Sequence, residues 1–266
     1  MPGWLELYVR GERLLEGGVS VVRGAWDGLW LGVLTEAQLA RLDERYYDGQ
    51  EMYRSEAWNR SGFQPWEEQL VDAHFPAGGR VVVLGAGGGR EVLELLARGH
   101  DAWGHEPNAA LASAGSVLTA ADGHGARVLP SARSAWPDDA GRADAVLLGW
   151  GSYMLVPTRA QRVALLRAAS AATGDRGPVA FSYFPMPPGR RQFWVTARVA
   201  GLLRRLRGAP PPLLGDALSP NFVHHFTGRQ VREEVEAAGL VLVARGTGDY
   251  GWAVARRGTT AGGRTT

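Results

Sequence analysis

The pattern of apolar and polar positions predicts strands that alternate with helices over most of the chain. Residues 81–84 form an unbroken run of Val and Leu, which is typical of a strand buried on both faces of a parallel sheet. Residues 90–98 follow with helical periodicity, and Gly99 ends that pattern. Further strands are predicted at 101–105, 127–130, 143–148, 178–184, 240–244 and 252–255, with helices at 109–121, 158–174 and 227–238. Such regular alternation predicts an α/β sheet protein.

The first 34 residues carry a weaker pattern. Residues 5–9 and 19–21 alternate between apolar and polar side chains, which permits one or two short strands or a loose hairpin. Thr35 and Gln38 then have the spacing of a capping box, so a helix is predicted from there through Tyr46.

Two segments interrupt the strand and helix alternation. Residues 46–68 are dense in aromatic and polar groups, and both a lid over a ligand and an aromatic cap on the sheet edge remain open for them. The proline-bounded insertion 185–223 contains a predicted basic amphipathic helix at 192–206; a lid helix is favoured over one that binds a membrane or an acidic partner. We therefore expect an N-terminal extension and lid (1–68), a sheet domain with a cap insertion (69–258) and a disordered tail (259–266).

A glycine-rich turn joins the first predicted strand to its helix: Gly85, Ala86, Gly87, Gly88 and Gly89. Glycine allows the chain to turn with positive φ and to approach a ligand closely. The next strand ends in Glu106, which lies 21 residues after Gly85. In a doubly wound sheet such a carboxylate lies beside the turn and can accept hydrogen bonds from both hydroxyls of a ribose. The pattern therefore predicts a nucleotide-containing cofactor.

The glycine spacing separates two classes of cofactor. A dinucleotide fold requires G-x-G-x-x-G, and its third glycine would fall at Arg90. Gly85, Gly87 and Gly89 instead form G-x-G-x-G, which resembles motif I of the class I S-adenosylmethionine (SAM) methyltransferases, and Glu106 resembles their ribose-binding acidic residue. This resemblance implies a doubly wound, mostly parallel seven-stranded Rossmann-like sheet whose last strand inserts antiparallel beside the fifth.

The resemblance also implies SAM as the cofactor and suggests which residues contact it. After the third strand Ser131 and Ala132 would lie near the adenine, and the segment GWGSYM resembles motif IV, whose loop lies under the transferring methyl group. The cofactor-binding residues expected in this way are Gly85, Ala86, Gly87, Gly89, Glu106, Pro107, Ser131, Ala132, Gly149, Trp150 and Gly151. Two positions depart from the family, because Val83 stands where an acidic residue is usual and Ser131 where Asp is frequent.

Methyl transfer from a sulfonium is a direct displacement, so the protein has to position the reactants, exclude water and, for a poor nucleophile, supply a base. His224 and His225 are candidates for that base, and at most one should act, because adjacent residues in an extended segment point oppositely. Tyr153, in the loop that resembles motif IV, is the alternative as an orienting hydroxyl. That loop lacks the Pro-Pro-aromatic run of amino-directed nucleic-acid methyltransferases, so a small-molecule oxygen, carbon or nitrogen acceptor is expected.

Composition narrows the chemistry further. The chain has no cysteine, which excludes disulfides, thiolate metal ligands and a Cys nucleophile, and its histidines are too scattered to suggest a metal site. The formal net charge of +2 is too small to indicate nucleic acid as a partner. No apolar run reaches the length of a membrane span and no signal-peptide pattern is present, so a cytoplasmic enzyme is expected.

Two other functions remain open at this point. One is an NAD(P)-dependent oxidoreductase on a related sheet, although Arg90 replaces the third glycine and the chain has no Lys for a Tyr-x-x-x-Lys motif. The other is a SAM-binding protein without transfer activity, which the departures at Val83 and Ser131 keep open. Neither the acceptor nor the oligomeric state follows from the sequence.

Overall fold

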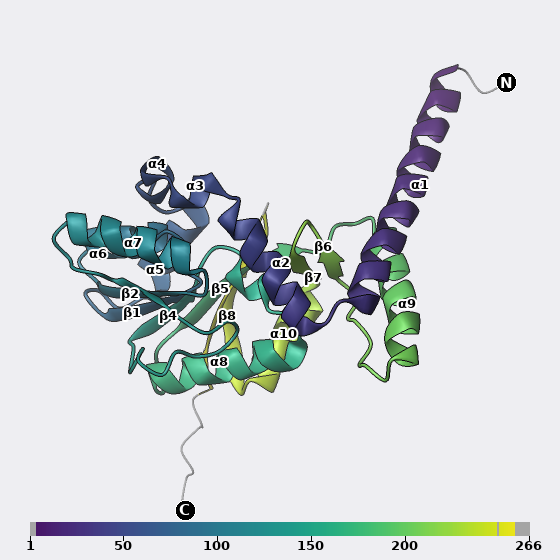
Figure 1. Ribbon diagram of the computed structural model, residues 1–266. Helices are drawn as coiled ribbons and strands as arrows, with labels where there is room; N and C mark the ends of the chain where they lie inside the picture. Colours follow the sequence, from purple (N-terminus) through teal and green to yellow (C-terminus); the bar gives the residue numbers. More distant parts are fainter. Residues whose placement is uncertain (1–3, 249, 259–266) are drawn as a thin grey trace, which may run out of the picture. The chain divides into compact units, whose positions relative to one another are not determined.

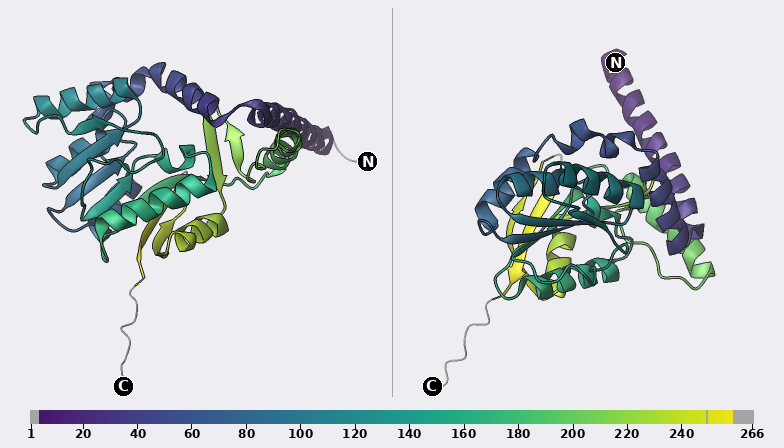
Figure 2. Two further views of the ribbon diagram at one scale, coloured as in Figure 1. Left: turned by 60° about the horizontal axis from the view of Figure 1, so that its bottom comes forward. Right: turned by 60° about the vertical axis from the view of Figure 1, so that its left-hand side comes forward.

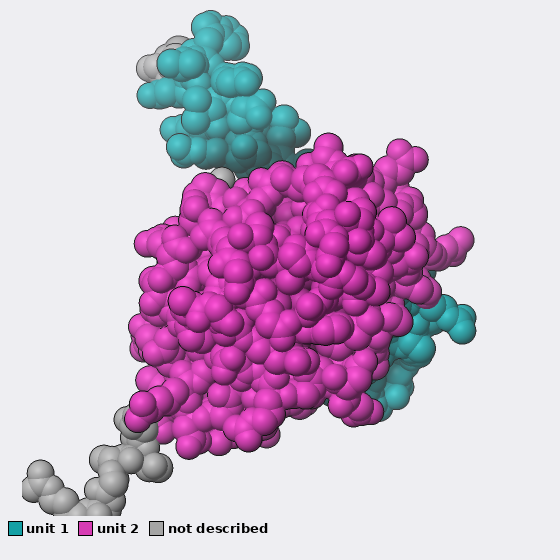
Figure 3. Space-filling view, turned by 90° about the vertical axis from the view of Figure 1, so that its left-hand side faces the viewer, with its two compact units in different colours: residues 1–43, 186–225 teal, residues 44–185, 226–266 magenta. Residues whose placement is uncertain are grey.

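The computed structural model describes residues 4–248 and 250–258, and the chain divides into two compact units (Figure 3). Unit 1 consists of residues 1–43 and 186–225, and unit 2 consists of residues 44–185 and 226–266. The insertion after the fifth strand thus belongs with the N-terminal segment, whereas the aromatic-rich segment 46–68 and the glycine turn both belong to unit 2. The tail predicted to be disordered, 259–266, lies outside the described residues.

Unit 2 is built on a mostly parallel sheet with helices on both faces (Figures 1 and 2). Its strands lie in the order β3-β2-β1-β4-β5-β9-β8, and β9 runs antiparallel to both β5 and β8. The strands are β1 (Arg80–Leu84), β2 (Asp101–Glu106), β3 (Val128–Pro130), β4 (Ala145–Leu148), β5 (Val179–Pro185), β8 (Leu240–Gly246) and β9 (Gly251–Arg257). The predicted α/β fold, with an antiparallel last strand beside the fifth, is confirmed.

The four helices of unit 2 that the sequence predicts begin where its signals place them, whereas the helices within residues 51–74 were not predicted. Asn108 caps α7, Thr158 caps α8 and Thr227 caps α10, each through its side-chain oxygen. Helices α6 and α7 lie on one face of the sheet, and α8 and α10 lie on the other (Figure 1). The helices are α3 (Glu51–Arg54), α4 (Glu56–Asn59), α5 (Pro65–His74), α6 (Arg90–Ala97), α7 (Ala109–Ala121), α8 (Arg159–Thr173) and α10 (Gly228–Ala237), with a 3-10 turn η1 (Ser152–Leu155).

The first strand occupies the centre of the hydrophobic core. Val81, Val82 and Val83 are completely buried, as are Ala145 and Val146 of the neighbouring β4. Helices cover both faces of these parallel strands, which is why their sequences are continuously apolar rather than alternating. Burial of Val83 also places an aliphatic side chain in the core at the position where an acidic residue is usual in the methyltransferases.

Unit 1 pairs two long helices, α1 (Trp4–Val33) and α9 (Arg191–Leu206), with a short antiparallel hairpin, β6 (Asp216–Leu218) and β7 (Phe222–Phe226) (Figure 1). Helix α2 (Glu36–Asp48) begins in this unit, with Thr35 and Gln38 forming the predicted capping box. Its small core consists of Leu31, Leu39, Ala200, Leu218 and Phe222. The helix predicted at 192–206 is confirmed, whereas the β6–β7 hairpin was not predicted.

The short strands or hairpin that alternation permitted in residues 1–34 do not form, and that interpretation is wrong. The segment is one continuous helix, α1, and the reason lies in its packing against α9. Gly24, Gly28 and Gly32 are spaced by one helical turn, and a Cβ at each would lie 2.5–2.7 Å from atoms of α9. The missing side chains allow close backbone approach, and Thr196 of α9 donates to the carbonyl of Gly24 at 3.1 Å. Within the described residues, neither α1 nor any other helix is long and apolar enough to cross a membrane.

Replacing Gly28 by alanine should destabilise this helix pair. The new Cβ would lie 2.7 Å from the Cβ of Val199 and 2.8 Å from the carbonyl oxygen of Thr196, so the helices would have to separate. Overpacking of this kind costs about 1–3 kcal/mol of unfolding free energy, measurable by denaturant titration of the full chain. Gly201→Ala in α9 is the matched control, because the nearest atom to a Cβ at Gly201 lies 3.9 Å away and alanine favours a helix. A Gly28→Ala variant as stable as Gly201→Ala would contradict the glycine contact.

Candidate cofactor site

The glycine turn leaves β1 with the backbone conformations that only glycine adopts readily. Gly85, Gly87 and Gly89 have φ values of 68°, 54° and 97°, and Gly89 is the N-cap residue of helix α6. The turn is held by the carbonyl of His105, which accepts from the N–H of Gly85 at 2.8 Å. A Cβ at Gly87 would have no atom within 4 Å, so the turn presents an open, backbone-lined surface at that residue.

Glu106 lies against this turn, as the sequence predicts. Its Oε2 accepts from the N–H of Gly87 at 2.9 Å, and its Oε1 accepts from the N–H of Asn108 at 2.7 Å. Asn108 in turn donates from Nδ2 to Asp48 at 2.9 Å. The residue is only 8% exposed, and backbone N–H groups orient both of its carboxylate oxygens. This arrangement suits an acceptor of hydrogen bonds from two ribose hydroxyls.

Pro107, which follows β2, and Ser131 and Ala132, which follow β3, lie at the same edge of the sheet as Glu106. The N–H of Ser131 donates to the carbonyl of Glu106 at 3.1 Å. Pro107 and Ser131 are partly buried, whereas Ala132 is exposed. The structure therefore brings these residues together with the end of β2.

The loop that resembles motif IV packs directly on the glycine turn. The N–H of Gly149 donates to the carbonyl of Leu84 at 2.8 Å, and a Cβ at Gly149 would lie 2.6 Å from the carbonyl oxygen of Gly85. The backbone N–H of Trp150 donates to the carboxylate of Glu91 at 3.0 Å. The backbone N–H of Gly151, which has φ of 74°, donates to the hydroxyl of Ser182 at 2.9 Å. Glu91 and Ser182 thus fix this loop, and sequence reasoning missed both, since neither belongs to a motif.

The aromatic-rich segment lies over the other side of the turn. A Cβ at Gly88 would lie 2.2 Å from the carbonyl oxygen of Tyr53 and 2.4 Å from Nδ2 of Asn59. Asn59 is 1% exposed and donates to the carbonyls of Tyr53 and Ser55, both at 2.9 Å. Among the described residues, its Oδ1 is a buried acceptor without a donor. Helices α3 and α4 therefore cover Gly88 but leave one buried polar atom at the turn unsatisfied.

Ligand binding should protect this covering segment from proteolysis. Arg54 and Arg60 are exposed or partly exposed trypsin sites in α3 and just after α4, and their short helices have little packing of their own. Cleavage after one of these residues should precede cleavage in the sheet, and saturating SAM or S-adenosylhomocysteine should slow it roughly fivefold or more. The fragments are identified by mass spectrometry. Cleavage confined to the chain ends, at a rate that ligand does not change, would contradict a lid.

A buried charge cluster joins the start of α6 to α5. Arg90 donates to both carboxylate oxygens of Glu67 at 2.6 Å, to Glu91 at 2.9 Å and to the carbonyl of Gly62 at 2.7 Å. Burial raises the pKa of Glu67, and the hydrogen bonds from Arg90 oppose that shift. Arg90 thus occupies the place of the third glycine of a dinucleotide motif with a buried, fully engaged guanidinium, which disfavours dinucleotide binding.

Five aromatic rings form a continuous row beside this loop, which we call the aromatic row: Tyr53, Trp58, Trp150, Tyr250 and Phe184. Successive ring centroids are 6.2, 5.5, 5.0 and 5.2 Å apart. All five side chains are partly exposed, and burial raises the pKa of Tyr53 to about 12. The rings come from α3, α4, the loop after β4, the end of β5 and the segment before β9, so an aromatic surface arises from distant parts of the chain. The planes of neighbouring rings are inclined to one another by 31–82°.

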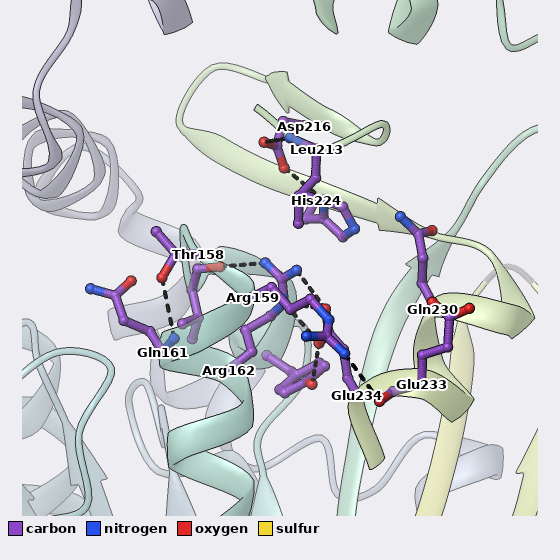
Figure 4. Close-up of polar contacts among 12 residues, drawn as sticks. Thr158, Arg159, Gln161, Arg162, Leu213, Asp216, His224, Gln230, Glu233 and Glu234 are labelled. Carbon is purple, nitrogen blue, oxygen red and sulfur yellow. Dashed lines mark hydrogen bonds and ion pairs between the residues drawn. The ribbon is translucent and has the colours of Figure 1, made fainter. Parts of the chain in front are cut away.

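Tyr153 does not lie where an orienting hydroxyl is useful. Its side chain is completely buried, stacks on Phe226 at 5.4 Å and donates its hydroxyl to Glu234 at 2.6 Å. Glu234 is also bound by Arg162 (Figure 4). Burial and the neighbouring Glu234 raise the pKa of Tyr153 well above its ordinary value. The geometry corrects the expectation from sequence, since this hydroxyl is engaged in a buried network that supports the fold.

The two candidate bases lie next to each other on β7, one buried and the other partly exposed. His224 is completely buried, and its Nδ1 lies 2.7 Å from Oδ1 of Asp216 on the paired strand β6 (Figure 4). His225 is partly exposed, and its ring packs 4.9 Å from that of Phe193. Sequence reasoning did not identify Asp216, because the pairing of β6 with β7 has no strong local signal.

Comparisons with known proteins bear on the fold. No protein-family model and no curated protein sequence matches the chain. Among solved structures, it is similar to a 1,6-didemethyltoxoflavin-N1-methyltransferase of Burkholderia thailandensis, with bound 1,6-didemethyltoxoflavin and S-adenosylhomocysteine (TM-score 0.57, 16% identity, covering 85% of this chain and 91% of that one). It is also similar to a SAM-dependent methyltransferase of Clostridium acetobutylicum (TM-score 0.55, 10% identity, 80% and 97% covered).

A third similar structure is the CcbJ methyltransferase of Streptomyces caelestis (TM-score 0.54, 16% identity, 72% of this chain and 88% of that one covered). The identities are low, so the likeness concerns the backbone: the strand order and the antiparallel last strand described above. On these grounds, the chain has the fold of the class I SAM-dependent methyltransferases.

Proposed function

We propose that this protein is a SAM-dependent methyltransferase that acts on a small-molecule acceptor by direct displacement. The observation that carries the proposal is the contact of Glu106 with the N–H of Gly87, at the open surface of a G-x-G-x-G turn in a methyltransferase fold. The side-chain oxygen Oδ1 of Asn59 and the indole nitrogen Nε1 of Trp150 are buried and have no partners among the described residues. Both lie on the segments that flank this turn. Residues of this kind fit a polar cofactor.

Each element of the candidate site has a distinct task in this proposal. Glu106 would bind the ribose hydroxyls, and the end of β3 would adjoin the adenine. The residues proposed to hold the cofactor are Gly85, Ala86, Gly87, Gly89, Glu106, Pro107, Ser131, Ala132, Gly149, Trp150 and Gly151. When bound, SAM supplies an electrophilic methyl group on a positively charged sulfur. The chain's own contribution is to orient that group and to exclude water from it.

The aromatic row favours an acceptor with a flat or extended apolar surface. Ring faces bind such molecules by stacking and by burial of apolar area, with little loss of side-chain entropy. The similar Burkholderia enzyme was solved with 1,6-didemethyltoxoflavin bound, which supports a small molecule as the acceptor of this chain. The acceptor atom, whether oxygen, carbon or nitrogen, is not part of the proposal.

Calorimetric titration tests the cofactor and separates the alternatives. SAM and S-adenosylhomocysteine should bind with a Kd on the order of 1–100 μM, and NAD should give no binding heat. Binding of NAD instead would replace this proposal with the oxidoreductase. A metabolite screen that follows S-adenosylhomocysteine then distinguishes an enzyme from a protein that binds SAM without transfer, since only the enzyme releases that product.

For an acceptor that must lose a proton, we propose His224 rather than His225 as the base. Oδ1 of Asp216 lies 2.7 Å from Nδ1 of His224, and such a carboxylate can orient an imidazole that acts as a base. His224→Ala should lower turnover about a hundredfold while SAM affinity stays unchanged. His225→Ala is the matched control, and Asp216→Asn should reproduce part of the loss. Full turnover in both His variants across the pH range would exclude this pair, and the acceptor would then be acidic enough to react without a base.

A further inference from the structure

Helix α1 carries an apolar face that its own unit does not use. Positions spaced alternately by four and three residues along α1 form one stripe on the helix, as in a coiled coil. These positions are Trp4, Tyr8, Gly11, Leu15, Gly18, Val22, Ala25 and Leu29. The charged residues Glu6, Arg10 and Arg13 lie outside this stripe, as do Gly24 and Gly28, which contact α9. The stripe therefore contains no charge over its whole length.

This stripe is exposed to an unusual extent. Trp4 is 88% exposed, Leu15 65% and Val22 71%, and the flanking Val19 and Trp26 are 68% and 56% exposed. Figures 1 and 2 show the N-terminal part of α1 extending beyond α9, the helix that covers its other side. Together the stripe and its flanking residues expose on the order of 700 Å² of apolar surface, close to the ~800 Å² that each partner buries in a stable interface. A monomer rarely exposes an apolar patch of that size.

The order of side-chain sizes along the stripe makes it complementary to itself in one direction only. If two copies of α1 cross antiparallel about a point between residues 16 and 17, Leu15 faces Gly18 of the second copy and Tyr8 faces Ala25. Val22 likewise faces Gly11, so in the central part of the stripe each large side chain meets a small one and the two helices can interdigitate. In a parallel pair every residue would face itself, and glycine opposite glycine would leave voids. A Cβ at Gly11 or at Gly18 would have no atom within 4 Å, so both positions can receive a partner side chain.

A cavity lies beside the C-terminal end of the stripe, where Trp26 flanks it. It has a volume of about 340 Å³ and is lined by six apolar residues and two charged ones: Trp26, Trp30, Leu34, Leu42, Leu218, Pro220, Arg23 and Asp27. The antiparallel arrangement brings Trp4 of the second copy opposite Leu29, on the side of the helix next to Trp26. The most exposed aromatic side chain of one copy thus lies near a mostly apolar hollow of the other, and the two-fold axis makes this contact twice.

We propose that this protein forms a two-fold symmetric dimer in which the apolar stripes of two α1 helices pack antiparallel. The occupant of the exposed face is a second copy of this chain, and the interface is independent of the methyltransferase activity proposed above. Its centre lies at Leu15 and Gly18, and at each end Trp4 lies near the cavity beside Trp26.

The mass in solution is the first test. Sedimentation of the full chain at micromolar concentration should give twice the 28.6 kDa of one copy. Leu15→Glu places a charge at the centre of the interface and should raise the dissociation constant roughly a hundredfold or more. Arg13→Glu is the matched control on the opposite side of α1 and should stay dimeric. A monomeric parent, including one that instead cosediments with lipid vesicles, would overturn the proposal, as would an equal loss of dimer in both variants.

Cysteine cross-linking tests the direction, and the chain has no cysteine of its own to interfere. A Tyr8→Cys variant should not form a covalent dimer under mild oxidation, because the two copies of residue 8 lie far apart in an antiparallel pair. The double variant Tyr8→Cys/Ala25→Cys should do so, since residue 8 faces residue 25 of the second copy. Cross-linking of the single variant would show a parallel pair and would overturn the arrangement. Thermal unfolding of each variant confirms that the monomer fold is unchanged.

Discussion

Replacing Glu234 by alanine is expected to destabilise unit 2 by about 3–5 kcal/mol, because it leaves the buried guanidinium of Arg162 without its counter-ion. Arg162 and Glu234 are 0% and 1% exposed, and Arg162 Nη2 donates to Glu234 at 2.7 Å (Figure 4). The other donors of Arg162 are also engaged, and its Nη1 donates to the carbonyl of Val156 at 3.0 Å. The loss should appear as a lower denaturant midpoint in the full chain.

Neighbouring residues supply the controls for this measurement. Glu233→Ala removes an exposed carboxylate of the same helix and should change stability by less than about 0.5 kcal/mol. Tyr153→Phe removes only the hydroxyl that donates to Glu234 and should cost about 1 kcal/mol without lowering turnover of a folded enzyme. A large loss of turnover in a stable Tyr153→Phe variant would restore the orienting role that the geometry argues against.

The second large effect concerns the cofactor. Glu106→Ala should weaken SAM at least a hundredfold, because hydrogen bonds to a carboxylate contribute about 1.5–3 kcal/mol each and two ribose hydroxyls lose their acceptor. The substitution also leaves the N–H groups of Gly87 and Asn108 without the acceptor that orients the turn. Titration calorimetry with SAM measures the change, and circular dichroism shows whether the variant is folded.

A conservative variant separates the two contributions of Glu106. Glu106→Gln keeps one acceptor for the N–H of Gly87 but loses the charge, so it should bind SAM with an affinity between those of the parent and of the alanine variant. Val83 cannot substitute for the lost carboxylate, because it is aliphatic and fully buried. A folded Glu106→Ala protein that binds SAM as tightly as the parent would show that the ribose lies elsewhere.

Local sequence signals were sufficient for the sheet and for the location of the cofactor turn. The β-branched run at 81–84, the glycines after it and the carboxylate at position 106 each act through the backbone within a few residues, so their geometry hardly depends on the rest of the chain. The caps at Asn108, Thr158 and Thr227 are equally local, which is why the helix starts agree with the predictions.

Other features depend on side chains from distant segments, and only the tertiary structure decided them. Residues 4–33 form a helix because Gly24 and Gly28 meet α9, a contact that spans more than 160 positions of sequence and leaves no pattern within the segment itself. Tyr153 lies in a motif-like loop, but its role is set by Glu234 on α10. The aromatic row and the His224–Asp216 pair arise in the same way from separate elements.

The physical reason is the range of the interactions. Glycine conformations, caps and continuous burial are imposed by neighbouring residues, so the sequence by itself determined the class of fold, the turn and Glu106 at its side. Side-chain packing and buried ion pairs depend on which surfaces meet, and many partners satisfy the same local pattern equally well. Tertiary structure alone therefore decided that Tyr153 and Arg90 are buried, that Asp216 orients His224, and that α1 keeps one face for α9 and leaves the other exposed.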